Sequence, residues 1–254
     1  MELPNVSILM PTYNRRNFLP LIMSNLYFQT YPKDKLELVI IDDGKSPLFI
    51  NDEEIKAISK HIGIPINYIR DTNQHYSIGA KRNKLVKLSK YKTLIFIDDD
   101  DIYQSEYIKY SVEELIKGKY GLVGSNQMIF VYPYHDFKIT GIKCEAKRQI
   151  HEATMCFTKK YYRSMPGFNK TGVGEGSGVI DWNDKKVGLT DVSKCMICIA
   201  HKNNTVDKEL FIQNDIDSNG EINPQYKQLI SSCLGIPLSP LPKVISPKPT
   251  LTGV

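Results

Sequence analysis

The segment at residues 94–103, LIFIDDDDIY, limits the possible folds of this chain more than any other. Its first four residues are apolar, a run typical of a buried parallel strand, and the next four are Asp98, Asp99, Asp100 and Asp101. Adjacent carboxylates repel one another by roughly a few kcal/mol per pair, and a bound divalent cation would remove that repulsion. A polar turn with Asp101 as the N-cap of the next helix would explain one aspartate but not four. We therefore predict a metal site at the end of this strand.

The first 120 residues alternate between short apolar runs and helix-period segments. This alternation predicts an α/β fold with a mainly parallel central sheet flanked by helices, followed by an irregular second half. Three expected strands end in polar residues, PTYN, DDG and DDDD, and ligands bind beyond the carboxyl ends of such strands. We therefore expect the three polar ends to line one crevice. The expected strands are residues 6–10, 36–41, 66–69 and 94–97, and the expected helices include 52–62, with Asp52 as N-cap, 77–89 and 106–117.

Composition is that of an ordinary globular protein and sets only broad limits on function. The net charge of +5 over 254 residues is too small to argue for a nucleic-acid partner and suits a polyanionic small ligand. No linker divides the chain convincingly, so we expect one domain over residues 1–234. Five prolines lie between residues 237 and 249, which predicts an extended C-terminal arm over residues 235–254.

Cysteine usage and hydropathy indicate the compartment. The five cysteines are odd in number, and the CxxC formed by Cys195 and Cys198 lies in an apolar strand, where core packing is expected rather than zinc or redox chemistry. We find no signal-peptide pattern and no apolar stretch long enough for a transmembrane segment. These features predict a cytoplasmic protein, with peripheral membrane association left open.

Several motifs in a fixed order carry a resemblance to a known family. The succession VSILMPTYNR, LVIIDDGKS, GAKRNKLVKL and LIFIDDDDIY, followed by EATMCFTKKYYRSMPGFN, resembles the family 2 glycosyltransferases of the GT-A fold over roughly residues 5–180. The resemblance implies a nucleotide-binding half at residues 1–120 and an acceptor half at 121–234. It further implies inverting transfer of a sugar from a nucleotide sugar, expected to be a UDP-sugar, to a hydroxyl of a glycan or other acceptor.

The resemblance also implies roles for individual residues of the donor side. Asp43 would accept a hydrogen bond from the base, expected to be uracil, and Arg82 would lie near the nucleotide or its phosphates. In the DxD signature, Asp98 or Asp99 would face the ribose and Asp100 would hold Mn²⁺ or Mg²⁺, since hard oxygen ligands suit these ions. We expect Lys81, Lys84 and Lys87 to form a solvated helix face. The remaining donor-side residues, which would border the nucleobase, are Pro11, Thr12 and Tyr13.

An inverting transfer needs a base that takes the proton of the acceptor hydroxyl. The family usually supplies it from a Glu-Asp pair after a Gly-Phe segment, and here Glu175 falls at that place while Gly176 replaces the Asp. We favour Glu175 as the base, with Asp181 as the second candidate. A late histidine can complete the metal site in related enzymes, which makes His201 a candidate ligand, although a hydrogen-bonded histidine at a strand end is an equal alternative.

Two other function classes fit less well. A haloacid-dehalogenase-like phosphatase also carries a DxD strand, but near the start of the chain and followed by Thr or Val, where Ile102 stands here. A nucleotide- or carbohydrate-binding module that has lost catalysis would agree with the incomplete Glu-Asp pair. The segment at residues 215–226 matches the first eight positions of an EF-hand loop but ends in Tyr226 instead of Glu, so we interpret it as an Asx-rich turn.

Overall fold

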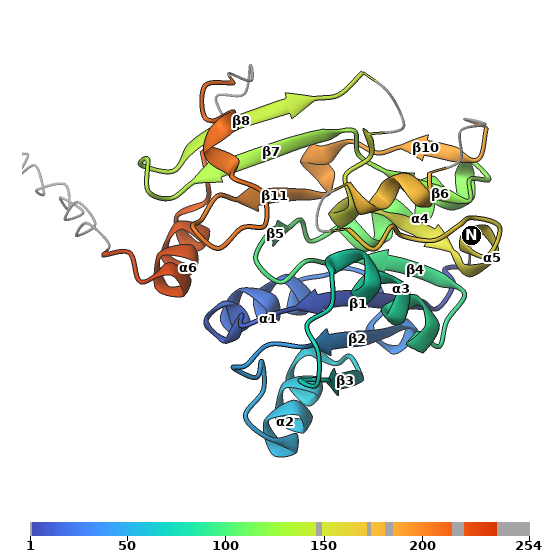
Figure 1. Cartoon of the computed structure of the whole chain (residues 1–254), viewed down its shortest axis with the longest axis horizontal. Helices are drawn as coiled ribbons and strands as arrows, with labels where there is room; N and C mark the ends of the chain where they lie inside the picture. Colours follow the sequence, from blue (N-terminus) through green and yellow to red (C-terminus); the bar gives the residue numbers. More distant parts are fainter. Residues whose placement is uncertain (1, 146–148, 172–173, 181–184, 215–220, 238–254) are drawn as a thin grey trace, which may run out of the picture.

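A computed structural model describes residues 2–145, 149–171, 174–180, 185–214 and 221–237 (Figure 1). Within these residues, a seven-stranded sheet has the order β10-β6-β9-β4-β1-β2-β3. Strands β4, β1, β2 and β3 are parallel, β9 is antiparallel to both β4 and β6, and β10 is parallel to β6. The mainly parallel sheet predicted from the alternating pattern is thereby confirmed. The strands are β1 (Val6–Thr12), β2 (Leu36–Asp42), β3 (Ile66–Arg70), β4 (Thr93–Phe96), β6 (Leu122–Gly124), β9 (Cys156–Thr158) and β10 (Val187–Leu189).

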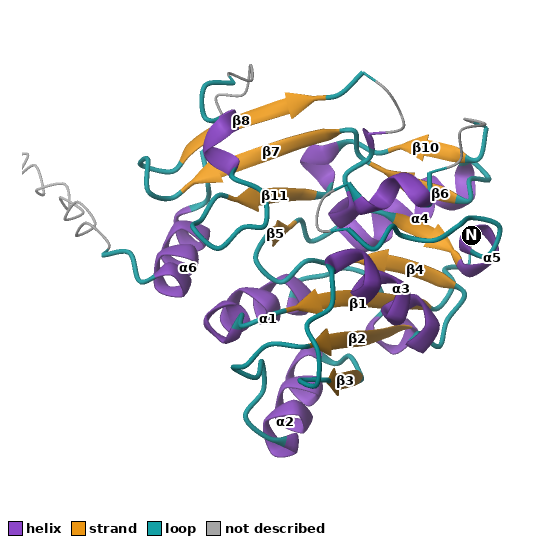
Figure 2. Ribbon diagram, in the orientation of Figure 1, coloured by secondary structure: helices purple, strands orange, loops and turns teal. Residues whose placement is uncertain are grey.

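Helices cover both faces of this sheet because successive strand residues point to opposite sides (Figure 2). Ile8 and Met10 of β1 pack with α1 (Leu19–Tyr27), α2 (Asp52–Ile62), α4 (Tyr107–Lys117) and α6 (Pro224–Leu234). Leu9, between them, packs on the other face with α3 (Ile78–Leu88) and α5 (Lys159–Tyr162). The sheet is therefore buried on both sides and exposes its functional groups at strand ends.

The helix ends follow capping chemistry. Helix α2 begins after Asn51, whose side chain accepts a hydrogen bond from Glu54 N over 2.9 Å, so the expected N-cap at Asp52 is wrong by one residue. Its C-terminal end is Gly63, at φ +72°, a left-handed conformation that glycine adopts without a Cβ clash. Ser77 caps α3 in the same way, because its side chain accepts a hydrogen bond from Ala80 N.

The second half contains a four-stranded sheet that the sequence did not predict. Its order is β5-β11-β7-β8, and Figure 1 shows β11, β7 and β8 side by side above the central sheet. Strand β5 follows the four aspartates directly and pairs with β11, which brings the late part of the chain to the end of β4. These strands are β5 (Ile102–Tyr103), β7 (Gln127–Tyr132), β8 (Lys138–Lys143) and β11 (Met196–Ile199).

This second sheet also corrects the role expected for Asp101. The Asp101 carboxylate is buried and accepts a hydrogen bond from Ile199 N over 2.9 Å, so it joins β5 to β11 instead of capping a helix. Helix α4 begins only at Tyr107, after Glu106, which makes no side-chain cap. Asp101 satisfies a backbone donor of the second sheet, and a buried donor left without a partner would be costly.

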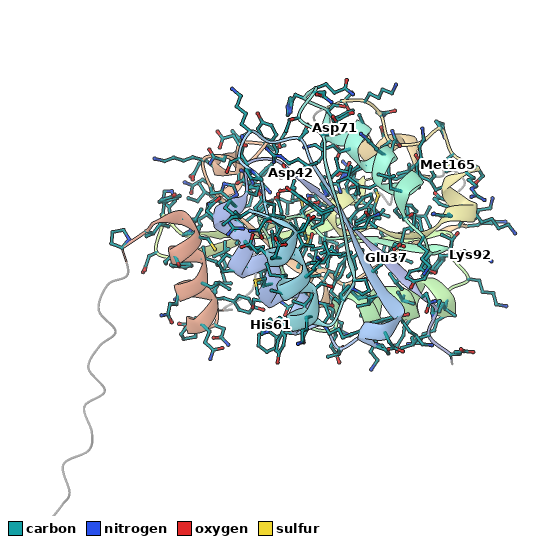
Figure 3. All side chains as sticks on the ribbon, turned by 90° about the horizontal axis from the view of Figure 1, so that it is seen from below. Glu37, Asp42, His61, Asp71, Lys92 and Met165 are labelled. Carbon is teal, nitrogen blue, oxygen red and sulfur yellow. The ribbon has the colours of Figure 1, made fainter. Side chains whose placement is uncertain are left out.

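Short 3₁₀ segments connect the larger elements, and two of them, η4 (Glu152–Thr154) and η5 (Glu175–Gly178), carry residues of the site described below. Figure 3 shows Glu37 and Asp42 at opposite ends of β2, which identifies the carboxyl edge of the sheet. None of the helices within the described residues has the length and apolarity needed to cross a bilayer. Further 3₁₀ segments are η1 (Arg16–Phe18), η2 (Lys33–Lys35), η6 (Val192–Lys194) and η7 (Lys208–Phe211).

Candidate active site

The loops that follow β1 and β2 pack directly against each other at the carboxyl edge. Asn14 has φ +56°, and its Oδ1 accepts a hydrogen bond from Ser46 N over 2.9 Å. A Cβ on Gly44 would lie 2.5 Å from Asn14 N, so this approach requires glycine in the DDG turn. The PTYN and DDG motifs, 30 residues apart in the chain, thus form one wall.

Asp43 is the centre of a buried polar cluster in that wall. Its Oδ1 accepts a hydrogen bond from Lys81 Nζ over 2.7 Å, and its Oδ2 accepts one from Tyr76 N over 2.7 Å. His75 Nδ1 lies 3.1 Å from the same Oδ2. Lys81 Nζ also donates to Thr12 O over 3.1 Å, which ties β1 to the cluster. The carboxylate is therefore held in one orientation by donors from α3 and from the loop that precedes it.

The solvated helix face predicted for the α3 lysines is wrong for Lys81, whose side chain is only 5% exposed. A buried ammonium requires a partner, and Asp43 provides it. Lys84 is half-buried and pairs with Asp71 over 2.7 Å, whereas Lys87 is exposed as expected. Helical periodicity alone does not distinguish these three lysines, because Asp43, the partner of Lys81, comes from the distant segment after β2.

Tyr13 is the exposed aromatic residue of the PTYN motif. Pro11 and Thr12 are buried as the last residues of β1, while Tyr13 is 37% exposed. The Tyr13 and His75 rings have centroids 4.6 Å apart, and Lys81 Nζ lies 5.4 Å from the Tyr13 ring centroid. Two aromatic rings therefore lie beside the Asp43 cluster, an arrangement that a planar heterocycle could contact by stacking.

The four aspartates have four different sets of partners. Asp98 Oδ2 accepts a hydrogen bond from Arg82 Nη2 over 3.2 Å, and Asp99 Oδ1 lies 3.6 Å from Arg15 Nε. Asp100 Oδ2 lies 3.1 Å from Arg15 Nη2 and 3.0 Å from His201 Nε2. Asp101 bonds to β11, as described above.

Burial and neighbouring groups shift the pKa values of Asp99, Asp100 and Asp101 in different directions. Burial, reinforced by the Asp100 charge, raises the pKa of Asp99 well above its ordinary value and that of Asp101 to about 7. For Asp100, burial is outweighed by the His201 hydrogen bond and the Arg15 charge, which together lower its pKa to about 2. Asp100 therefore loses its proton more readily than its neighbours Asp99 and Asp101.

The Asp100 carboxylate suits a hard divalent cation, and His201 Nε2, which hydrogen-bonds to it here, lies at the spacing of a second ligand. Two adjacent ligands of an octahedral ion with bonds of about 2.1 Å lie about 3 Å apart, and Asp100 Oδ2 and His201 Nε2 are separated by 3.0 Å. Among the described residues no group of three or more His, Cys, Asp and Glu side chains is arranged to hold a metal. A cation here would therefore take its other ligands from substrate oxygens and water, as Mg²⁺ sites commonly do.

Arg82 connects the aspartates to Glu175. Its Nε donates to Glu175 Oε1 over 3.0 Å, and the side chains are 4% and 7% exposed. Within the described part of the chain, Arg82 Nη1 and Asp98 Oδ1 are buried without a hydrogen-bond partner. Both unsatisfied atoms belong to one buried ion pair, and such atoms are often completed by a ligand or ordered water.

The loop that carries Glu175 lies tightly against α3. A Cβ on Gly79 would lie 1.8 Å from Asn169 O, and Asn169 N donates to Glu175 O over 2.9 Å. Glycine in the first turn of α3 therefore allows Glu175 to reach Arg82. The second candidate base, Asp181, lies outside the described residues, as do residues 215–220 of the EF-hand-like segment.

Sequence reasoning assigned no site role to Arg15, Lys81 or Glu152. Arg15 directly follows PTYN, and Lys81 precedes Arg82, so proximity to a motif was an available signal for both. Glu152 opens the motif EATMCFTKKYYRSMPGFN, so it had the same signal, but the hydrogen bond that its Oε1 accepts from Gly176 N over 2.8 Å is a contact that only the fold creates. Cys195 and Cys198 are free and buried, which confirms core packing for the CxxC.

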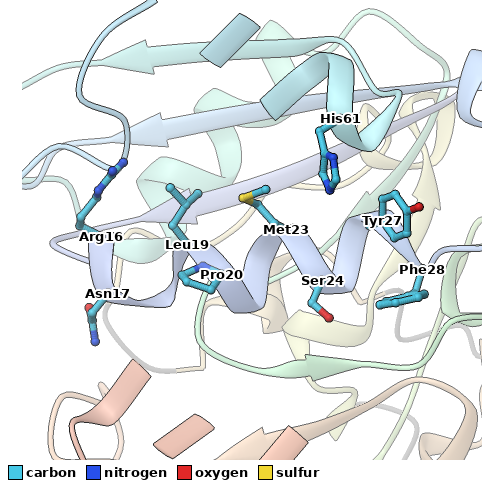
Figure 4. A pocket seen from close by; sticks show the side chains of 9 residues that line it. All are labelled: Arg16, Asn17, Leu19, Pro20, Met23, Ser24, Tyr27, Phe28 and His61. Atoms are coloured by element: carbon cyan, nitrogen blue, oxygen red, sulfur yellow. The ribbon is translucent and has the colours of Figure 1, made fainter. Parts of the chain in front are cut away.

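A separate hollow of about 770 Å³ lies along the outer side of α1 (Figure 4). Leu19, Met23 and Tyr27 line it from α1, and His61 reaches it from α2, with its ring stacked on Tyr27 at 5.1 Å between centroids. None of the residues predicted for the site borders this hollow. The groups with catalytic potential therefore gather at the carboxyl edge of the sheet and not in this surface depression.

Comparison with known proteins agrees with this geometry. The family model "Glycosyl transferase family 2" matches residues 7–178. The poly(ribitol-phosphate) beta-N-acetylglucosaminyltransferase TarP of Staphylococcus aureus (strain N315) is 30% identical over 131 residues, which are 49% of this chain and 39% of TarP. An uncharacterized glycosyltransferase of Rickettsia bellii is 25% identical over 183 residues, covering 66% of this chain and 25% of that protein. The chain thus spans less than half the length of these relatives.

Solved structures show the same fold. The mannosyltransferase PcManGT from Pyrobaculum calidifontis, in complex with GDP-Man and Mn²⁺, superposes with a TM-score of 0.60 at 16% identity, over 93% of this chain and 70% of that one. S. aureus TarS 1-349 in complex with UDP-GlcNAc has a TM-score of 0.60 at 13% identity, over 91% and 71%. The predicted GT-A fold is confirmed. The family match over residues 7–178 establishes that the chain belongs to glycosyl transferase family 2.

Proposed function

We propose that this chain transfers a sugar from a nucleotide sugar, preferentially a UDP-sugar, to a hydroxyl of a glycan or other acceptor, with inversion and with help from a divalent cation. One observation carries the proposal: the Asp100–His201 pair and the Asp43 cluster both contact the segment that ends β1 and follows it. The segment after β1 links them, because Thr12 O binds Lys81 of the Asp43 cluster while Arg15 reaches Asp100. A base-binding wall beside a cation site suits a nucleoside diphosphate.

The Asp43 cluster supports recognition of uracil. The N3–H of uracil is a donor, and Asp43, held by Lys81 and Tyr76, offers a buried acceptor of fixed orientation. Tyr13 and His75 would contact the ring face. The TarS complexes contain UDP and UDP-GlcNAc, whereas PcManGT holds GDP-Man, so the choice of base is part of the proposal.

Asp100 and His201 would hold Mn²⁺ or Mg²⁺, which when bound neutralises diphosphate oxygens and so stabilises the departing nucleoside diphosphate. Asp98 or Asp99 would face the ribose, with Arg82 fixing the orientation of Asp98. On the acceptor side a carboxylate takes the proton of the attacking hydroxyl. Glu175 and Asp181 stay predictions for that role, because Glu175 Oε1 already bonds to Arg82 and Asp181 lies outside the described residues.

Calorimetric titration of the chain with UDP, with and without MnCl₂, tests the donor site. We expect Mn²⁺ to tighten UDP binding at least about tenfold, a free-energy difference of about 1.4 kcal/mol. A parallel titration with GDP measures base preference and should give weaker binding. UDP affinity that is independent of Mn²⁺ and Mg²⁺ would contradict the proposed metal-dependent transfer.

A nucleotide-binding module without catalysis is the second candidate function, and Gly176 in place of the family's Asp is the observation that favours it. Release of UDP from a panel of UDP-sugars, with water as acceptor, separates the two functions. Mn²⁺-dependent release identifies an enzyme, and tight UDP binding without release of UDP from any of the sugars identifies a binding module.

A further inference from the structure

The space in front of Gly176 is occupied by another carboxylate. A Cβ built on Gly176 would lie 2.6 Å from Glu152 Oε1 and 2.8 Å from Glu152 Cγ. Gly176 N donates to the same Oε1 over 2.8 Å. The Glu152 carboxylate therefore lies where a side chain at position 176 would project, the position at which the Glu-Asp pattern has its Asp.

The fold holds Glu152 next to the aspartates. It begins η4, and the carbonyl of the next residue, Ala153, accepts hydrogen bonds from Tyr103 and Tyr107, each over 3.2 Å. The Tyr103 hydroxyl accepts a hydrogen bond from Asp98 N over 2.8 Å. One tyrosine hydroxyl thus joins the backbone beside Glu152 to the first aspartate of the run, so Glu152 is on a rigid support.

Glu152 and Glu175 differ in their ion-pair partners. Glu175 is 7% exposed and bonds to Arg82. The ion pairs among the described residues include that one but none with Glu152. Burial and the nearby Glu175 charge raise the pKa of Glu152, which brings a carboxylate closer to the range useful for proton abstraction.

Glu152 also borders an open space on the acceptor half. A hollow of about 240 Å³ is lined by Glu152 and its neighbour His151, and also by Gly174 and Ser177 of the Glu175 loop. Asn126, next to β7, contributes an amide to the same hollow. Its apolar lining includes Met128, Ile150 and Ile180, and polar groups beside such apolar side chains suit a hydroxylated ligand.

We propose that Glu152 is the general base of the transfer reaction and that this hollow receives the acceptor. The inference rests on the proposed function. In the step, the acceptor hydroxyl loses its proton to a Glu152 oxygen while its oxygen bonds to the anomeric carbon. The bond from that carbon to the diphosphate oxygen breaks, and its electron pair leaves with the nucleoside diphosphate. Glu175 then acts as a positioning residue that holds Arg82.

Exchanging the two positions tests the assignment. UDP release from the UDP-sugar panel, with Mn²⁺ and water as acceptor, is measured for the wild type, Glu152→Gln, Glu152→Ala and the double variant Glu152→Ala/Gly176→Asp. We expect Glu152→Gln and Glu152→Ala to reduce turnover about 100-fold or more, the usual contribution of a general base. Their UDP affinity should stay within about twofold of the wild type. The double variant should regain at least about tenfold over Glu152→Ala, because removing the Glu152 side chain makes room for a carboxylate at 176.

These measurements distinguish failure of the Glu152 assignment from failure of the proposed glycosyl transfer. Wild-type turnover that Glu152→Gln leaves unchanged overturns the base assignment while glycosyl transfer stands. Loss of turnover in Asp181→Asn, with Glu152→Gln fully active, overturns it in favour of Asp181. If the wild type binds UDP but releases none from any sugar, both the inference and catalysis fail and the binding module remains. If Glu152→Gln does not fold, recovery of turnover by the double variant still decides the question.

Discussion

Arg82 Nε donates to Glu175 Oε1 over 3.0 Å across 93 residues of sequence, and so joins helix α3 to the η5 segment. The same guanidinium reaches Asp98 through Nη2 over 3.2 Å. Its Cζ lies 4.5 Å from the centroid of the Phe96 ring, which forms one side of its buried environment. The planar, forked shape of arginine allows one side chain to serve both carboxylates.

Replacing Arg82 should therefore destabilise the protein strongly. Arg82→Met leaves the buried Glu175 and the partly buried Asp98 without their cation, and we expect the free energy of unfolding to fall by about 3–5 kcal/mol. Arg82→Lys should restore only part of this, because an ammonium cannot reproduce both hydrogen bonds. Urea unfolding followed by fluorescence measures the change.

The matched control is Lys84→Met on the same helix. Lys84 is half-buried and pairs with Asp71, so its loss should cost less than about 1 kcal/mol. Equal losses of unfolding free energy in Arg82→Met and Lys84→Met would show that the buried ion pairs of Arg82 stabilise the protein no more than the half-buried pair of Lys84.

Substitutions at the neighbouring Asp100 and Asp101 should have different effects, the first on metal binding and the second on folding stability. Asp100→Ala removes a proposed ligand, and the Mn²⁺-dependent gain in UDP affinity should disappear. Asp101→Ala removes the acceptor of Ile199 N, and we expect a loss of about 1–3 kcal/mol of folding free energy with the Mn²⁺ effect retained. UDP calorimetry with MnCl₂ and with EDTA, beside urea unfolding, measures both. An unchanged Mn²⁺ effect in Asp100→Ala would place the cation elsewhere.

Lys81 and Asp43 should act as one unit. Lys81→Met leaves Asp43 buried without its cation, and we expect a loss of about 3 kcal/mol of folding free energy and about tenfold in UDP affinity. A double-mutant cycle with Asp43→Asn measures the coupling energy, because each single change removes the same contact. Lys87→Met, an exposed lysine on the same helix, should change neither quantity. Additive effects in the cycle would rule out the coupling.

His151 should make the protein sensitive to mild acid. Burial, with the positive charges of Lys208 and Arg82, lowers the pKa of His151 from 6.5 to about 3. Between these values the unfolded chain binds one proton more than the folded chain, so the free energy of unfolding falls as the pH falls from about 6.5 toward 3.

Replacing the imidazole with a neutral amide tests this dependence. Between pH 7 and pH 5, Glu152 and the other carboxylates titrate in both proteins, so His151→Gln should lose about 1–2 kcal/mol less folding free energy than the wild type. Urea unfolding at the two pH values gives the difference. Parallel pH profiles would mean that His151 is protonated in the folded protein.

Much of the architecture was predictable from local sequence. The four strands β1 to β4 were expected within a few residues of their observed bounds, and three polar strand ends were expected at one edge. Apolar runs, helix periodicity and turn residues depend on near neighbours in the chain, and so they can be read without knowledge of the fold. The N-cap of α2 was predicted one residue too late, at Asp52 instead of Asn51, because both residues are good N-caps.

The partners of buried polar groups were not predictable in this way. Lys81 meets Asp43 across 38 residues, Asp101 meets Ile199 across 98, and Gly176 meets Glu152 across 24. Each residue looked like something else in isolation: a solvated lysine, a helix cap and a glycine in a loop. The α/β fold, the family and the edge at which the site lies follow from periodicity and motifs, because these are local features of the chain. Which charge neutralises which, and which carboxylate lies in front of Gly176, depends on how distant segments pack, and therefore became visible in the folded molecule alone.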